Sequence, residues 1–125
     1  LCFYIYMSLP IITKFTNFQA LKDVLSENPG VVIVKFGATW CKPCAMIEDV
    51  VEEFFKRMPD NVQIAKIDID ESIGLYGFLK TKKVVNGVPC LLAYYQGNEH
   101  HIPDEFVSGT DKLQLREFFL THVTM

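Results

Sequence analysis

Two cysteines separated by two residues are the part of this sequence best suited to chemistry. Cys41 and Cys44 stand where an apolar, β-branched run ends and a helical pattern begins. The free N–H groups and partial positive charge of a helix N-terminus stabilise a thiolate on the first cysteine. The spacing returns the second cysteine to the side of the first on the first helical turn, and Pro43 suits the start of a helix. The pattern predicts a redox-active thiol pair.

Two other interpretations of the same cysteines are open. A C-x-x-C is half of many zinc sites, but the sequence has neither a second C-x-x-C nor a suitably spaced histidine pair. His100 and His101 are adjacent and stand in a different segment. The cysteines can also be ordinary core residues, although Trp40 and Lys42 beside them favour a functional motif. We expect no metal and no bound cofactor, the redox group being the cysteine pair itself.

Composition limits the class of protein. The chain has 125 residues, of which 50% are hydrophobic and 22% charged, enough apolar material for the core of one domain. Its formal net charge of −3 argues against a general nucleic-acid binder, which is usually basic. Its 4 cysteines fall well short of the roughly 8–10% that marks a disulfide scaffold.

Helical and strand patterns alternate around the cysteine pair. A Thr16 or Asn17 cap opens the first helical pattern and Asp111 opens the last, in which Leu113 is one of the apolar positions. Pro103 restricts the last strand to a sheet edge. We predict a mixed sheet with helices on both faces, an α/β fold. Helices are expected over 15–27, 43–58, 72–82 and 111–123, and strands over 31–36, 62–68, 90–95 and within 100–107.

The first ten residues differ from the rest. Residues 1–10 carry no charge, are shorter than the roughly 20 residues of a membrane span and contain Pro10. They also lack the basic start of a signal peptide. We interpret them as an N-terminal extension, with Met7 as a candidate natural start, in front of a domain covering 11–125. We expect no membrane insertion and a cytoplasmic location, with a secretory or organellar origin as the alternative.

Four segments in order make the chain resemble the thioredoxin family. Trp40-Cys41-Lys42-Pro43-Cys44 differs from the family's usual WCGPC by one residue, and Pro89 and Gly109 stand where the family has a cis-proline and a glycine. The resemblance implies the thioredoxin fold, a mixed central sheet of four to five strands with about four flanking helices. The four matching segments are VIVKFGATWCKPC at 32–44, AKIDIDE at 65–71, NGVPCLL at 86–92 and FVSGTDK at 106–112.

The resemblance also implies a mechanism. Cys41 would attack a protein disulfide, and the more buried Cys44 would resolve the mixed disulfide. The partners implied are protein disulfides and a thioredoxin reductase-type electron donor, with a monomeric chain and no nucleic acid. A disulfide oxidase or isomerase, or a partner-binding protein with little redox activity, is the alternative. The substrate surface would comprise Trp40, Lys42, Pro43, Val88, Pro89 and Gly109.

Three residues depart from the family pattern. Lys35 replaces a buried acid near the second cysteine; it can act as a neutral base, stabilise a thiolate, pair with Asp68 or simply reach water. Lys42 replaces a glycine, and its charge favours a Cys41 thiolate and a potential tens of millivolts above about −270 mV; otherwise it influences only partner choice. Cys90 follows Pro89, and we expect it near the pair, either as an alternative disulfide partner or as a small packing residue.

Overall fold

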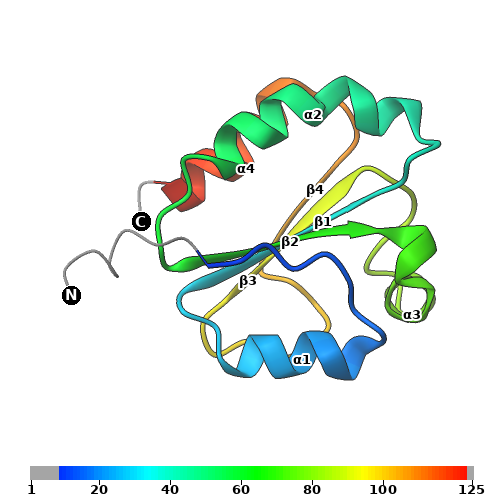
Figure 1. The fold of residues 1–125 in the computed structure, drawn as a ribbon, viewed down its shortest axis with the longest axis vertical. Helices are drawn as coiled ribbons and strands as arrows, with labels where there is room; N and C mark the ends of the chain where they lie inside the picture. Colours follow the sequence, from blue (N-terminus) through cyan, green and yellow to red (C-terminus); the bar gives the residue numbers. More distant parts are fainter. Residues whose placement is uncertain (1–8, 124–125) are drawn as a thin grey trace.

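A mixed sheet of four strands forms the centre of the computed structural model, which describes residues 9–123 (Figure 1). The strand order is β2-β1-β3-β4; β1 runs parallel to β2 and antiparallel to β3, which is antiparallel to β4. In chain order the elements are α1 (Phe18–Ser26), β1 (Val31–Gly37), α2 (Lys42–Phe55), β2 (Val62–Asp68), the 3₁₀ turn η2 (Ile69–Glu71), α3 (Ile73–Thr81), β3 (Cys90–Tyr95), β4 (Glu105–Ser108) and α4 (Lys112–Val123).

Helices cover both faces of the sheet, as the sequence pattern predicts. α2 and α4 lie on one face and α1 on the other, while α3 lies at the end of the sheet where β1 leads into α2 (Figure 1). Every residue of β1 is buried. A strand covered on both sides has no polar face, which explains its nearly continuous apolar, β-branched sequence.

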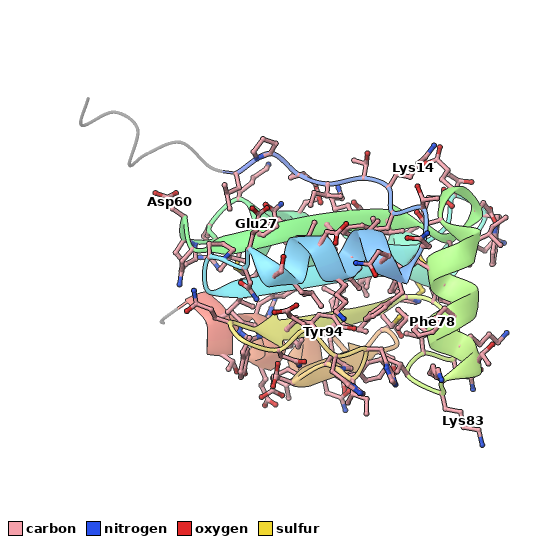
Figure 2. All side chains as sticks on the ribbon, turned by 90° about the horizontal axis from the view of Figure 1, so that it is seen from below. Lys14, Glu27, Asp60, Phe78, Lys83 and Tyr94 are labelled. Carbon is pink, nitrogen blue, oxygen red and sulfur yellow. A yellow bond between two sulfur atoms is a disulfide. The ribbon has the colours of Figure 1, made fainter. Side chains whose placement is uncertain are left out.

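The sheet separates two apolar cores. Ile33 on β1 packs with α2 and α4, where the rings of Phe54 and Phe119 stack with centroids 4.9 Å apart. On the opposite face, Phe36 of β1 and Tyr94 of β3 pack with α1 and α3. Figure 2 looks onto this second face, with Tyr94 and Phe78 labelled. Successive residues of one strand therefore belong to different cores, which determines which side chains can approach the cysteine pair.

The segment before α1 pairs with the outer edge of the sheet. The Ile12 N–H donates to the Ile64 carbonyl at 3.1 Å, and the Lys66 N–H donates to the Ile12 carbonyl at 2.8 Å. Ile12 and Ala65 form a single parallel bridge, and the segment runs beside β2 (Figure 2). The sheet thus has four strands plus one bridge, within the predicted four to five.

The predicted elements are all present, with shifted ends. The first helix begins at Phe18 because Asn17, not Thr16, caps it: the Asn17 side chain accepts from the Ala20 N–H at 3.0 Å. The second helix ends at Phe55, earlier than predicted. Leu113, one of the apolar positions of the last helix, is not in the core, since 67% of this residue is exposed. It lies in the first turn of α4, whose buried face begins at Leu115.

The N-terminal extension falls largely outside the described residues, since residues 1–8 are not among them. Of its members, Leu9 and Pro10 are described, and both are exposed. No helix within 9–123 combines the length and apolar character needed to cross a bilayer.

A buried histidine predicts acid-sensitive folding. His122 is fully buried, with its ring 5.1 Å from that of Phe118 and 5.9 Å from that of Tyr95. Burial lowers the pKa of His122, although Glu105 partly opposes this. The unfolded chain therefore binds this proton more readily, and stability is lost as the pH falls below about 6.5.

We expect His122→Phe to flatten this dependence. Urea unfolding at pH values of about 7.5 and 5 should show a larger loss of unfolding free energy in the unsubstituted protein, by at most about 1.4 kcal/mol per pH unit for one proton. His100→Gln, on an exposed position, serves as the control. Equal pH dependence in all three proteins would contradict the assignment.

Candidate active site

The cysteine pair lies at the junction of β1 and α2. Cys41 is the N-cap of α2 and Pro43 is in its first turn, so the helix begins at the pair itself. Cys41 and Cys44 form a disulfide, with Cα atoms 5.3 Å apart. The Cys41 Sγ also accepts a hydrogen bond from the Cys44 N–H at 3.2 Å. The helix N-terminus therefore directs a backbone donor at the first sulfur, as the sequence predicts.

Two hollows flank the disulfide. The outer groove, of about 420 Å³, is lined by Trp40, Cys41, Lys42, Pro43, Tyr76 and Val88, among others. The second hollow, of about 400 Å³, is also open to solvent; it is named the inner cavity because it lies between α2 and strands β1 and β2. Its lining includes Lys35, Cys41, Cys44, Glu48, Lys66 and Asp68, among others. Cys41 borders both hollows, whereas Cys44 borders only the inner cavity. Exposed fractions of 6% and 5% hardly distinguish the two cysteines, so the hollows define their difference.

The outer groove presents an aromatic side chain to solvent. Trp40 is 63% exposed, and its Nε1 donates to Oδ2 of Asp70 at 2.7 Å. This bond fixes the indole against η2. Lys42 and Lys80 also line the groove. The groove brings together Trp40, Lys42, Pro43 and Val88, which the sequence analysis assigned to a substrate surface.

The loop before β3 closes the groove from the other side. The Val88–Pro89 peptide is cis, as the resemblance implies. The Val88 carbonyl oxygen lies 3.7 Å from the Cys41 Sγ. Gly109, with φ +87°, donates its N–H to the Pro89 carbonyl at 3.1 Å. Gly109 therefore supports the proline loop and does not itself line either hollow.

A buried lysine lies in the inner cavity. Lys35 is only 7% exposed, and its Nζ donates to Oε2 of Glu48 on α2 at 2.8 Å. The predicted pair with Asp68 does not form. The Asp68 side chain instead accepts from the Asp70 N–H at 2.8 Å, where it caps η2. The alternative that Lys35 simply reaches water is also wrong.

Glu48 is the functional candidate that sequence analysis missed. It bridges two lysines, because Lys66 Nζ lies 3.7 Å from its Oε1. Lys66 Nζ also forms an ion pair with Oε2 of Glu52 at 2.7 Å. Glu48 follows Cys44 by four residues, which puts both on one face of α2. Two features of the sequence could have indicated Glu48: its spacing of four residues from Cys44, and Lys35 inside an otherwise apolar strand, which needs a counterion.

The charge on Glu48 is stabilised by its two partners. Burial opposes ionisation of the Glu48 carboxyl, but its hydrogen bond to Lys35 and the charges of Lys35 and Lys66 outweigh that effect and lower its pKa below the usual value. The side chain of Glu48 is about half exposed, so solvent also screens the pair.

Cys44 and Lys35 both lie beside Gly37, the last residue of β1. A Cβ at Gly37 would lie 3.6 Å from Sγ of Cys44 and 3.9 Å from Cε of Lys35. The sulfur and the lysine stem therefore lie around the same position at the end of β1. The inner cavity contains a cation, its counterion and the Cys44 sulfur.

Cys90 does not belong to this site. It is fully buried and packs with Phe36 in the core on the α1 side of the sheet, whereas Cys44 lies on α2, on the other side. Burial raises the pKa of the Cys90 thiol to about 12. Cys90 is a free thiol, so the alternative that it is a disulfide partner is wrong. Its role as a small packing residue agrees with its burial.

The site and fold define a dithiol–disulfide oxidoreductase whose redox group is its own disulfide. Within residues 9–123, no group of three or more His, Cys, Asp or Glu side chains is placed to hold a metal ion. The chain matches the family model described as Thioredoxin over residues 11–121. It belongs to the thioredoxin family.

Individual relatives agree with this assignment. The chain is 42% identical over 115 residues to a thioredoxin of Bacillus subtilis, covering 90% of this chain and 98% of that protein. It is 31% identical to a thioredoxin of Pseudomonas aeruginosa, over 86% and 92% of the two chains. A solved structure of a mutant thioredoxin from Halobacterium salinarum is similar with a TM-score of 0.67 and 31% identity, over 95% and 96% of the two chains.

The position of Cys90 predicts that it is protected from alkylation. Iodoacetamide reacts with thiolates, and a buried thiol with a raised pKa forms very little thiolate at neutral pH. In the reduced, folded protein, peptide mass mapping should therefore find the label on Cys41 and not on Cys90. Denaturation before labelling should expose Cys90, which is the internal control. Equal labelling of the two cysteines in the folded protein would contradict the assignment.

Proposed function

We propose that this chain reduces disulfides of partner proteins, with Cys41 as the attacking thiolate and Cys44 as the resolving thiol. The observation that carries this proposal is the asymmetry of the hollows: Cys41 borders the outer groove, and Cys44 borders only the inner cavity. A partner disulfide in the outer groove can therefore reach the first sulfur. The second sulfur is placed to attack the first from the protein side.

The reaction requires two exchanges. The Cys41 thiolate attacks one sulfur of the partner, forming a mixed disulfide and releasing the other partner sulfur as a thiolate that takes up a proton. Cys44 then loses its proton and attacks the Cys41 sulfur, so that the Cys41–Cys44 disulfide forms and the second partner sulfur leaves and is protonated. Two electrons pass from the chain to the partner. A thioredoxin reductase-type donor would return them.

The proline loop offers a backbone edge for the partner. Within residues 9–123, the Val88 N–H makes no hydrogen bond, and its carbonyl faces the Cys41 sulfur at 3.7 Å. An extended partner segment can pair with these groups as an added strand. Trp40 and Pro43 would supply apolar contact on the other side of the groove.

Insulin reduction tests the proposal. With dithiothreitol as electron source, catalytic amounts of the protein should accelerate precipitation of the insulin B chain. Cys41→Ser should lose essentially all of the acceleration, because no other thiol borders the outer groove among the described residues. Cys90→Ser, a conservative change on the other side of the sheet, should retain it. A rate no higher than that of dithiothreitol alone would favour a partner-binding protein instead.

A further inference from the structure

The two sulfurs of the active site have different sources of positive charge. Cys41 faces the N-terminus of α2 and accepts the Cys44 N–H. Cys44 and Lys35 both line the inner cavity, and both lie beside Gly37. The helix terminus accounts for activation of the first cysteine only, so the ionisation of the second requires a separate explanation.

We propose that the Lys35–Glu48 ion pair promotes ionisation of the resolving cysteine, Glu48 holding the Lys35 ammonium beside Cys44 so that its charge stabilises the thiolate that attacks the mixed disulfide. Lys35 acts directly on a reacting atom, and Glu48 is a positioning residue that acts through Lys35. The inference rests on the proposed function, since it assigns residues to its second step.

The Lys35 ammonium, rather than the Glu48 carboxylate, is the group that promotes ionisation of Cys44. A base that takes the proton of a thiol should have a pKa near that of the thiol, which is ordinarily about 8.5. Lys35 and Lys66 lower the pKa of Glu48 below the usual carboxyl value, which makes it a weaker base still. A positive charge close to a thiol, in contrast, favours the thiolate directly.

Glu48 is needed because Lys35 is buried. An ammonium group without a counterion is strongly unfavourable in such a place. Lys66 lies opposite Lys35 in the register of β1 and β2 and adds repulsion, which Glu48 relieves by bridging both lysines. The remaining charged or titratable groups around the inner cavity are Asp68 on β2, which caps η2, and the two cysteines; the β3 register partner of Lys35 is the apolar Leu91.

The step balances without another reagent. The Cys44 thiol gives its proton to water, and the thiolate attacks Sγ of Cys41 in the mixed disulfide. The bond between Cys41 and the partner sulfur breaks as the Cys41–Cys44 bond forms, and the partner thiolate takes up a proton. Lys35 keeps its own protons throughout. The ion pair therefore changes the pH at which the step runs, not its products.

Stopped-flow reaction with dithiobis(nitrobenzoate) separates the two cysteines. Attack by Cys41 releases one coloured nitrothiobenzoate in a phase whose rate depends on reagent concentration. Attack by Cys44 on the resulting mixed disulfide releases the second in a phase that does not depend on it. All proteins carry Cys2→Ser, which removes a thiol outside the described residues. The pH profile of the second phase reports ionisation of Cys44.

We expect Lys35→Met to move the second-phase profile to higher pH, slowing the phase on the order of tenfold at a pH of about 6, while the first phase changes far less. Glu48→Gln should shift the profile in the same direction, because the Lys35 ammonium, once it has lost its counterion, turns away from Cys44 toward water. A shift to lower pH, which the loss of the carboxylate's own negative charge would cause, would overturn the positioning role of Glu48. Lys35→Arg should keep most of the rate at low pH. Glu53→Gln is the matched control: it lies on the same helix, where it is exposed and 4.0 Å from Arg57.

A charge-reversed pair distinguishes electrostatics from packing. Lys35→Glu combined with Glu48→Lys keeps an ion pair but puts the negative partner beside Cys44, so the second-phase profile should move to higher pH than in Lys35→Met. A purely structural role predicts the profile of the unsubstituted protein. That result, or an unchanged profile in Lys35→Met or Glu48→Gln, would overturn the proposal. Thermal unfolding of each variant verifies that it is folded.

The reagent is a small disulfide, so the test does not depend on protein substrates. If the second phase shifts as expected while insulin is not reduced, the proposed function fails and the role of the ion pair stands. If insulin is reduced and the second phase is insensitive to Lys35 and Glu48, the ion-pair proposal alone fails.

Discussion

Burial of β1 on both faces is the constraint on which the rest of the structure depends. Each of its residues is buried, so the strand cannot move without disturbing two cores. Its end fixes where the chain turns into α2, and that turn holds Cys41 at the helix N-terminus. The same strand carries Lys35 on the α2 face, in the hollow that Cys41 and Cys44 also line. The position of the reactive pair is thus determined by packing that lies away from it.

The cost of that arrangement is one buried charge in the central strand. The buried charge of Lys35 is tolerated because the Glu48 carboxylate on α2 lies 2.8 Å from its Nζ. Lys66 in turn forms ion pairs with Glu48 and Glu52, so positive and negative side chains alternate from Lys35 toward the surface. Removing one partner of such a pair usually costs far more than the pair contributes. The Lys35–Glu48 ion pair therefore has two effects: it joins α2 to the sheet, and it places a positive charge in the hollow that the Cys44 sulfur lines.

Local patterns predicted most of the fold because most of it is locally determined. The β-branched run of β1, the apolar periodicity of α2 and the C-x-x-C between them are each visible within a few residues, and β2 and β3 have the predicted ends. Helix ends are predicted less accurately because they depend on which residue caps the helix. Thr16 and Asn17 are both suitable by residue type, and Asn17 accepts the Ala20 N–H.

The errors at the site concern contacts between distant segments. The partner of Lys35 depends on how α2 lies over β1, which no pattern within either segment reveals, so the sequence does not point to Glu48. Cys90 was placed near the pair because it follows Pro89 in sequence. Its antiparallel register with Phe36 puts the thiol on the other face of the sheet, and register between strands is not encoded at a single position.

The central claim is that Cys41 and Cys44 form a reducing couple, and its equilibrium potential against a glutathione buffer tests this most directly. We expect Lys42 and Lys35 both to favour thiolate forms, and we therefore predict a potential above that of a thioredoxin with neutral residues there, at about −250 mV against about −270 mV. A potential at or above about −180 mV, in the range of disulfide isomerases and oxidases, would contradict the account.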